Sequence, residues 1–460
     1  MSQEGLKSAI EKMTAAGVHE QAIAVFEHYY RALEEGATGF IPEDTIEPLD
    51  APPLLADVAV SDEDAKAAFE KTVIIKLNGG LGTSMGMDKA KSLLPVREGK
   101  SFLDLIVDQV LTARSAHGVP LPLVFMNSFR TSDDTLAALA KYDDLEVAGI
   151  GLEFVQNQEP KLRKDDLTPV EWPADPTLEW CPPGHGDLYT ALAASGVLDR
   201  LLAAGFRYAS VSNSDNLGAA PNATIAGWFA ASGAPYAAEV CRRTAADRKG
   251  GHLAIRKADG QLILRDTAQT PKEDMEYFTD EHRHPYFHTN NLWFDLETLS
   301  KTLTERKSVL GLPLIKNEKT VDPADASSPE VVQIETAMGS AIEVFEGATA
   351  IGVGRDRFLP VKTTSDLLLL RSDVYEVADD ATLTKVADPV PLIELDNSYY
   401  KTISAFQQRF PAGAPSLKEA RSLTVKGDWT FESGVTVTGV GELPDKGSPQ
   451  TVASGTVIGA

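Results

Sequence analysis

Short apolar runs in the middle of the chain alternate with segments whose apolar residues repeat at helical spacing. The β-branched run at residues 73–75 predicts a buried strand, residues 102–111 place their apolar side chains on one helical face, and residues 123–126 form a second buried run. A strand, a helix and a strand in this order predict a parallel sheet.

The alternation continues beyond this unit. Residues 135–141 and 187–204 have helical spacing, and residues 152–155 and 208–211 predict further buried strands. Residues 252–264 contain two strand-like runs around Asp259-Gly260, a turn signal that predicts an antiparallel hairpin. We therefore expect an α/β body built on a mixed sheet.

The two ends of the chain differ from this body. Residues 6–33 have amphipathic helical spacing, and the proline-rich residues 36–53 predict an irregular connector. After residue 386, short runs rich in Thr, Val and Gly predict a small β module. We expect a helical N-terminal extension (1–70), an α/β body (71–385) and a β-rich C-terminal domain (386–460).

Charge and cysteine content exclude several classes of function. The net charge of -24 argues against binding to nucleic acid or to an anionic membrane, so an anionic ligand requires a local basic pocket. No apolar run approaches the roughly 20 residues that span a bilayer. Two cysteines, Cys181 and Cys241, and a start unlike a signal peptide are typical of a soluble cytoplasmic protein.

The most informative motif is the glycine-rich segment 77–86, LNGGLGTSMG, directly after the first buried strand. Such glycines make a tight connection, and they also let backbone N–H groups approach a phosphate. The spacing matches neither the dinucleotide fingerprint nor the P-loop. Lys89 and Lys91 follow closely, which favours an anion-binding loop.

A second motif, residues 182–187 (PPGHGD), places His185 between two glycines. We expect Asp187 to cap the helix that follows. The histidine lies at the positive end of that helix, where a ring nitrogen can hydrogen-bond a ligand hydroxyl or phosphate.

Three further polar segments follow. Asp215 comes after a predicted parallel strand and is either a turn former or a Mg²⁺ ligand. The adjacent Asn290-Asn291 interrupt a strand-like run and indicate a bulge or a recognition site, while the nearby histidines lack the closed ligand set of a zinc site. Residues 354–366 form a basic loop containing Lys362, with Ser365 or Asp366 as the expected helix cap.

Together these motifs closely resemble the UTP-glucose-1-phosphate uridylyltransferase family of the eukaryotic type. The resemblance is carried by residues 77–86 with Lys91-Ser92, 126–129, 182–187, 215–217, 289–293 and 358–366. It implies a glycosyltransferase A-like, Rossmann-like catalytic domain with a mixed sheet and a left-handed β-helix at the C-terminus. It also implies that UTP and glucose 1-phosphate are converted to UDP-glucose and pyrophosphate with Mg²⁺ as cofactor.

The resemblance further implies roles for individual residues. UTP contacts are implied at Leu77, Asn78, Gly79, Gly80, Lys91, Gln158, Gly184, Asp215, Asn216 and Lys362. His185 and Asn290 are implied to contact glucose 1-phosphate, Asp215 to hold the metal, and Lys91 and Lys362 to act on the reacting phosphates. The residues after Gln158 depart from the family pattern, so Gln156 stays open as the uracil contact.

The residue types suit this chemistry. A sugar phosphate oxygen must attack the α-phosphorus of UTP, and at about 4 Å each pair of like charges repels by on the order of 4 kcal/mol at an effective dielectric of 20. Cations therefore matter more than a general base, and we interpret His185 as a positioning group. Two alternatives remain, a pyrophosphorylase for another sugar such as an N-acetylhexosamine, and a catalytically silent nucleotide-sugar sensor. A homo-oligomer formed through the C-terminal module is also possible.

Overall fold

A ten-stranded mixed sheet is the centre of the protein, seen here in a computed structural model that describes residues 2–37, 39–244 and 247–459. The strand order is β1-β12-β14-β10-β2-β5-β6, with β13 on β12, β11 on β14 and β17 on β11. These strands are β1 (Ile46–Pro48), β2 (Thr72–Asn78), β5 (Leu123–Asn127), β6 (Glu153–Val155), β10 (Tyr208–Asn213), β11 (Tyr236–Arg242), β12 (His252–Arg256), β13 (Leu262–Arg265), β14 (Tyr286–Asp295) and β17 (Thr349–Val353).

The direction of the strands determines where a ligand can bind. β10, β2, β5 and β6 are parallel, so their carboxyl ends lie at one edge of the sheet. β14 runs antiparallel to both β10 and β11, and its first residues reach the same edge. The predicted hairpin is confirmed as the antiparallel pair of β12 and β13.

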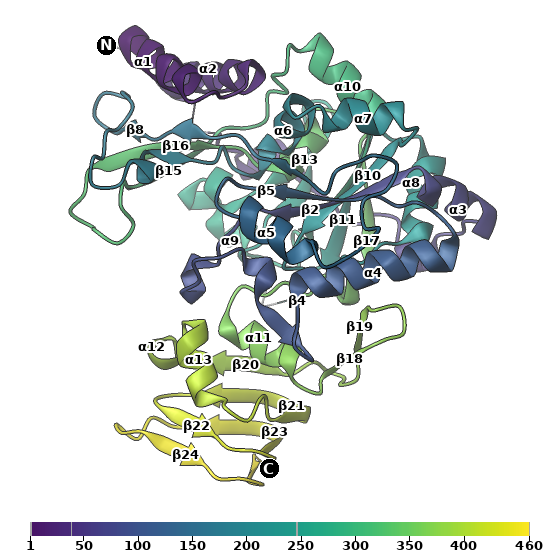
Figure 1. The fold of residues 1–460 in the computed structure, drawn as a ribbon, viewed down its shortest axis with the longest axis vertical. Helices are drawn as coiled ribbons and strands as arrows, with labels where there is room; N and C mark the ends of the chain where they lie inside the picture. Colours follow the sequence, from purple (N-terminus) through teal and green to yellow (C-terminus); the bar gives the residue numbers. More distant parts are fainter. Residues whose placement is uncertain (1, 38, 245–246, 460) are drawn as a thin grey trace.

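Both faces of the sheet are covered by helices (Figure 1). Side chains alternate along β2, so that Ile74 belongs to one apolar cluster while Val73 and Ile75 belong to the other. Burial on both sides explains why this strand is a continuous apolar run. The body helices are α3 (Asp62–Glu70), α4 (Phe102–His117), α5 (Ser132–Leu139), α6 (Leu188–Ala194), α7 (Val197–Ala203), α8 (Ala223–Ser232), α9 (Met275–Phe278), α10 (Leu296–Glu305) and α11 (Thr364–Arg371).

Two predictions at the level of elements were wrong in detail. The single helix expected over 187–204 is divided into α6 and α7, because Gly196 takes a left-handed conformation with φ +71°. The connector expected over 36–53 contains the short strand β1, which pairs with β12 and ends at Pro48. A proline is tolerated there because β1 is an edge strand.

The N-terminal residues form α1 (Ser2–Ala15) and α2 (Glu20–Glu34), which pack on the body. Phe26 and Tyr29 of α2 are buried in the same apolar cluster as Val73 and Ile75. Small sheets lie beside the main sheet. One consists of β8 (Leu162–Arg163), β15 (Ile315–Thr320) and β16 (Glu330–Glu335). The others are strand pairs: β7 (Glu159–Pro160) with β9 (Trp180–Cys181), β3 (Pro95–Arg97) with β4 (Lys100–Ser101), and β18 (Tyr375–Val377) with β19 (Leu383–Lys385).

The C-terminal strands lie at the opposite end of the molecule from α1 and α2 (Figure 1). All of their pairings are parallel, in the order β20-β21-β23-β25 and β22-β24. The elements are β20 (Leu392–Leu395), α12 (Asn397–Tyr400), α13 (Ile403–Arg409), β21 (Ser416–Val425), β22 (Trp429–Phe431), β23 (Thr436–Leu443), β24 (Gln450–Val452) and β25 (Val457–Ile458). None of the helices in the described part of the chain has the length and apolar character that a membrane crossing requires.

Candidate active site

The glycine-rich motif begins where β2 ends, at the ligand-accessible edge of the parallel strands. Gly82 and Gly86 have φ values of +65° and +72°, a left-handed conformation that favours glycine. The backbone N–H of Lys91 donates to the carbonyl of Gly80 at 3.0 Å. The loop therefore folds back on itself, so that Lys91 lies beside Gly80 near the start of the glycine-rich segment.

The buried side chain of Asn78 joins the ends of three strands. Its Nδ2 donates to Asn127 Oδ1 at 2.8 Å and to Thr135 Oγ1 at 2.9 Å, while its Oδ1 accepts from Ser214 Oγ at 3.0 Å. The carbonyl of Leu77 accepts from the backbone N–H of Ser214 at 3.0 Å. Leu77 and Asn78 thus connect the glycine-rich loop to the segment that carries Asp215.

Lys91 and Asp215 form an ion pair at the carboxyl ends of the parallel strands. Lys91 Nζ lies 2.6 Å from Asp215 Oδ2 and also donates to the carbonyl of Val361. The backbone N–H of Val361 donates to the carbonyl of Asp215 at 3.3 Å. Three segments far apart in the sequence therefore meet at one point, next to Lys362.

A cavity of about 370 Å³ opens beside this point. Its lining includes four of the predicted site residues: Asp215, Asn216, Asn290 and Lys362. Sequence reasoning missed Asp247, Lys249 and Asp266, which line the same cavity. The Gly250-Gly251 pair that follows Lys249 was the available signal, because glycines beside a cation are typical of a ligand loop.

The interruption expected at Asn290-Asn291 is confirmed as a bulge. The pairing of β11 with β14 changes register between Ala238 and Val240, and Asn290 has φ +60°. Its backbone N–H donates to His288 Nδ1 at 3.0 Å. Burial lowers the pKa of His288 to about 4, so its ring is neutral near pH 7. The described residues include no group of three or more His, Cys, Asp or Glu suited to a metal ion.

His185 is exposed on a tightly packed loop. Its Nδ1 accepts the backbone N–H of Met338 at 2.9 Å, which places the proton of the neutral ring on Nε2. Gly184 has φ +78°, and the N–H of Gly186 donates to the carbonyl of Thr336 at 2.8 Å. The ring is therefore held as a hydrogen-bond donor, which fits a positioning role.

Two expected helix caps were wrong. The carboxylate of Asp187 does not cap α6 and instead accepts two hydrogen bonds from Asn157. The N-cap of α11 is Thr363, with Asp366 completing a capping box, because the Thr363 hydroxyl and the Asp366 carboxylate satisfy each other's backbone N–H groups. The N–H of Lys362 also donates to Asp366 Oδ2, at 2.8 Å, which fixes the backbone that carries this exposed lysine.

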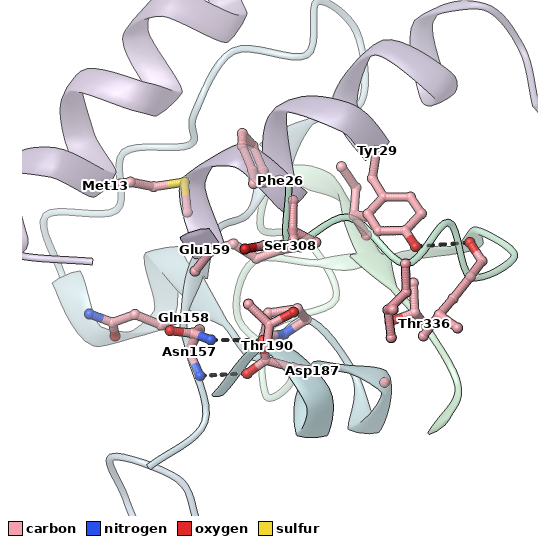
Figure 2. A pocket seen from close by; sticks show the side chains of 17 residues that line it. Met13, Phe26, Tyr29, Asn157, Gln158, Glu159, Asp187, Thr190, Ser308 and Thr336 are labelled. Carbon is pink, nitrogen blue, oxygen red and sulfur yellow. Dashed lines mark hydrogen bonds between the residues drawn. The ribbon is translucent and has the colours of Figure 1, made fainter. Parts of the chain in front are cut away.

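The two glutamines considered for uracil line one cavity of about 340 Å³, but they differ in their other contacts. A side chain at Gly79 would collide with Oε1 of Gln156, so the Gln156 amide lies against the glycine-rich loop. Gln158 lines a small cavity of about 30 Å³ beneath α1 and α2, and Figure 2 shows it with Met13 and Phe26 of those helices. The contact with Gly79 is thus made by Gln156, and the uracil contact itself stays a prediction.

A buried polar network around Glu239 holds together β11, β14 and the loop that precedes Lys362. Glu239 accepts from Arg357 at 2.7 and 3.0 Å, from Trp293 Nε1 at 3.0 Å and from Asn291 Nδ2 at 3.1 Å. Burial acts to raise the pKa of Glu239, but the Arg357 guanidinium and these hydrogen bonds bring it below its ordinary value.

Asn216 extends this network to the loop that precedes Lys362. Its Nδ2 donates to Asn291 Oδ1 and to the carbonyl of Arg357, and its Oδ1 accepts from the backbone N–H of Leu359 at 2.8 Å. The Asn216 amide is thus engaged by the protein. Its geometry supports a role in positioning the loop, and its contact with UTP stays a prediction.

A mixed α/β sheet with a glycine-rich loop at the carboxyl ends of its parallel strands, Lys91 paired with Asp215 and Lys362 on the adjacent cavity, has the arrangement of a nucleotide-binding enzyme of the α/β class. The model of the UTP-glucose-1-phosphate uridylyltransferase family matches residues 23–438, and the chain belongs to this family. A relative with the family's name from Hordeum vulgare is 38% identical over 454 residues, covering 95% of this chain and 91% of its own. One from Saccharomyces cerevisiae is 41% identical, with coverage of 81% and 73%.

Solved structures agree with this assignment. UDP-glucose phosphorylase from Trypanosoma brucei has a TM-score of 0.91 and 42% identity, covering 99% of this chain and 98% of its own. UDP-glucose pyrophosphorylase from Leishmania major, solved in open and closed forms, has a TM-score of 0.92 and 42% identity, with coverage of 99% and 98%. A mutant of the Leishmania enzyme was solved in complex with UDP-glucose.

Proposed function

We propose that this protein catalyses the reaction of UTP with glucose 1-phosphate to give UDP-glucose and pyrophosphate. The observation that carries the proposal is the meeting of Lys91, Asp215 and Val361 beside a cavity lined by Lys362 and Asn290, in a chain of this family. This arrangement brings cations to an edge of the sheet in a protein whose net charge is -24. The cavity wall also carries the carboxylates of Asp215, Asp247 and Asp266, so Lys249 and Lys362 supply positive charge at particular points and not through a net basic surface.

The reaction needs charge neutralisation and alignment. The phosphate oxygen of glucose 1-phosphate attacks the α-phosphorus of UTP and pyrophosphate leaves from the opposite side. Lys91 and Lys362 act on the phosphates, and the glycine-rich loop with Gly184 holds the nucleotide. His185, through Nε2–H, and Asn290 orient the sugar phosphate. The attacking oxygen is already ionised near neutral pH, so no residue has to remove a proton.

The site residues also fit a Mg²⁺ ion held by Asp215. Mg²⁺ requires only one or two protein carboxylates when substrate phosphates supply other ligands, and Asp215 is an oxygen donor on the cavity wall. When bound, the ion would neutralise phosphate charge. The Lys91 ammonium keeps the Asp215 carboxylate oriented by their ion pair.

Gln156 is our preferred candidate for the uracil contact, since its amide lies against Gly79, and Gln158 is the second candidate. We also infer that the three-part division at about residues 70 and 385 applies, with a glycosyltransferase A-like body. The parallel C-terminal strands support a small left-handed β-helix through which copies of the chain assemble. A cytoplasmic location stays a prediction from the cysteine content.

The experiment that tests this proposal is a pyrophosphate-release assay with Mg²⁺, run with each nucleoside triphosphate against a panel of sugar 1-phosphates. We expect turnover with UTP and glucose 1-phosphate to exceed every other combination. Preference for N-acetylhexosamine 1-phosphate would instead support the alternative sugar. Binding of UDP-glucose without any release of pyrophosphate would identify a silent sensor.

A further inference from the structure

Asp187 is a buried carboxylate whose two oxygens are both used by one neighbour. Its Oδ2 accepts the backbone N–H of Asn157 at 2.6 Å, and its Oδ1 accepts Asn157 Nδ2 at 2.8 Å. Figure 2 shows both hydrogen bonds, with the side chain of Gln158 directed away from the carboxylate. Asp187 is only 5% exposed, and among the described residues no ion pair to it is found.

A buried carboxylate without a cation is costly, and burial raises the pKa of Asp187 to about 7. A neutral side chain would avoid this cost. The two hydrogen bonds from Asn157 act against burial and lower the pKa of Asp187, because the ionised form accepts both donors with charge-assisted bonds that hold a loop more firmly than neutral ones. The residue type therefore indicates that the exact position of Asn157 matters to the protein.

The segment that Asp187 holds, residues 156–158, connects two parts of the proposed site: the glycine-rich loop and the loop that carries His185. Gln156, next to Asn157, is anchored by its N–H to the carbonyl of Asn127 at 2.8 Å, and its amide lies against Gly79. Asp187 itself is two residues from His185, on the loop whose Gly186 donates to Thr336. The Asp187–Asn157 contact thus ties the loop beside the nucleotide to the loop beside the sugar phosphate.

We propose that Asp187 is a positioning residue for base selection: it fixes residues 156–158 so that one of their glutamines can read the uracil edge. The inference rests on the proposed function and holds whichever of the two glutamines makes the contact. Asp187 acts through Asn157 and does not touch the substrate itself.

The test is to measure kcat and KM for UTP and CTP with Asp187→Asn. The amide retains the shape but presents an N–H group to one of the two donors of Asn157. We expect KM for UTP to rise by about tenfold, the preference for UTP over CTP to fall by a similar factor, and kcat to stay within about threefold. Asn157→Ala should give a partial effect, and the double variant should be no worse than Asp187→Asn.

Glu159→Gln is the matched control. Glu159 lines the same small cavity, and burial together with the nearby Asp187 and Glu335 raises the pKa of its carboxyl; glutamine keeps the shape of this side chain without an ionisable group. This variant should keep the wild-type preference for UTP. A loss of selectivity there equal to that of Asp187→Asn would attribute the effect to general loosening and overturn the proposal.

Other outcomes are equally decisive. A folded Asp187→Asn protein with an unchanged UTP preference, or with reduced kcat alone, would contradict base selection. If Asp187→Asn does not fold, Asn157→Ala decides on the same readouts. If wild-type protein forms no UDP-glucose, the proposed function fails separately. Calorimetric titration of wild type and variants with UTP and CTP then replaces the kinetic constants. Equal affinities of wild type for both nucleotides would overturn the inference as well.

Discussion

The ammonium group of Lys91 and the carboxylate of Asp215 lie 2.6 Å apart, although 124 positions separate them in the sequence. Both side chains are largely buried, with 16% and 20% exposure. Partial burial weakens solvent screening, so this pair is stronger than an exposed salt bridge. In the proposed reaction this pair supplies one positive charge for the triphosphate and one negative charge for its counter-ion.

Replacing Lys91 should therefore impair catalysis strongly. We expect Lys91→Ala to lower kcat/KM for UTP by about a hundredfold, because one preorganised charge near the reacting phosphates is lost. Lys89→Ala is the matched control, since Lys89 is an exposed lysine two positions away and should stay within about threefold of wild type. Steady-state pyrophosphate release measures both. Similar losses in the two variants would show that only the general basic character of the segment matters.

Removing the Asp215 carboxylate should change the response to metal. We expect Asp215→Asn to need at least about tenfold more Mg²⁺ for half-maximal rate, because an amide is a weaker ligand for a hard cation than a carboxylate. The measurement is initial rate against Mg²⁺ concentration at saturating substrates. Asp199→Asn, on the exposed part of α7, should leave the curve unchanged. An unchanged curve for Asp215→Asn would place the metal elsewhere.

Local sequence patterns predicted the elements that carry the site. The apolar run before Asn78 and the glycines after it predict a buried strand followed by a tight glycine loop, which β2 and the left-handed Gly82 and Gly86 confirm; anion binding by this loop stays a prediction. Two asparagines inside a strand-like run indicated a bulge or a recognition site, and the structure has a bulge at Asn290. These features follow from backbone chemistry within a few residues.

Contacts between distant segments were not predictable in the same way. Asp187 precedes a helix, so local rules favour a cap, but its partner Asn157 is 30 positions away. The choice between Gln156 and Gln158 depends on which residue of a short loop meets Gly79, and a separation of two residues leaves this undecided in sequence. The Glu239–Arg357 pair depends on strand order, which no local motif contains.

The Glu239–Arg357 pair allows a prediction about stability. Glu239→Gln should lower the free energy of unfolding by about 3 to 5 kcal/mol, because it leaves the buried Arg357 charge without its partner. The double variant Glu239→Gln/Arg357→Met should be more stable than the single one, since it removes the unpaired charge. Urea denaturation followed by fluorescence measures both. A double variant that is less stable than Glu239→Gln would show that the hydrogen bond from Arg357 to Ala220 is the greater contribution.

Buried His288 makes stability depend on pH in a defined window. Its folded-state pKa of about 4 lies below the unfolded value of about 6.5, so its contribution is fully present above pH 6.5 and is lost as the pH falls toward 4. His288→Gln keeps an acceptor for the N–H of Asn290 but does not titrate. Between pH 7.5 and pH 5, wild type should therefore lose roughly 1 to 2 kcal/mol more unfolding free energy than this variant. Chemical denaturation of both proteins across this range measures the difference. The control is His282→Gln, which replaces an exposed histidine on the preceding loop and should follow the wild-type curve. Parallel curves for wild type and His288→Gln would show that His288 is protonated equally in the folded and unfolded states.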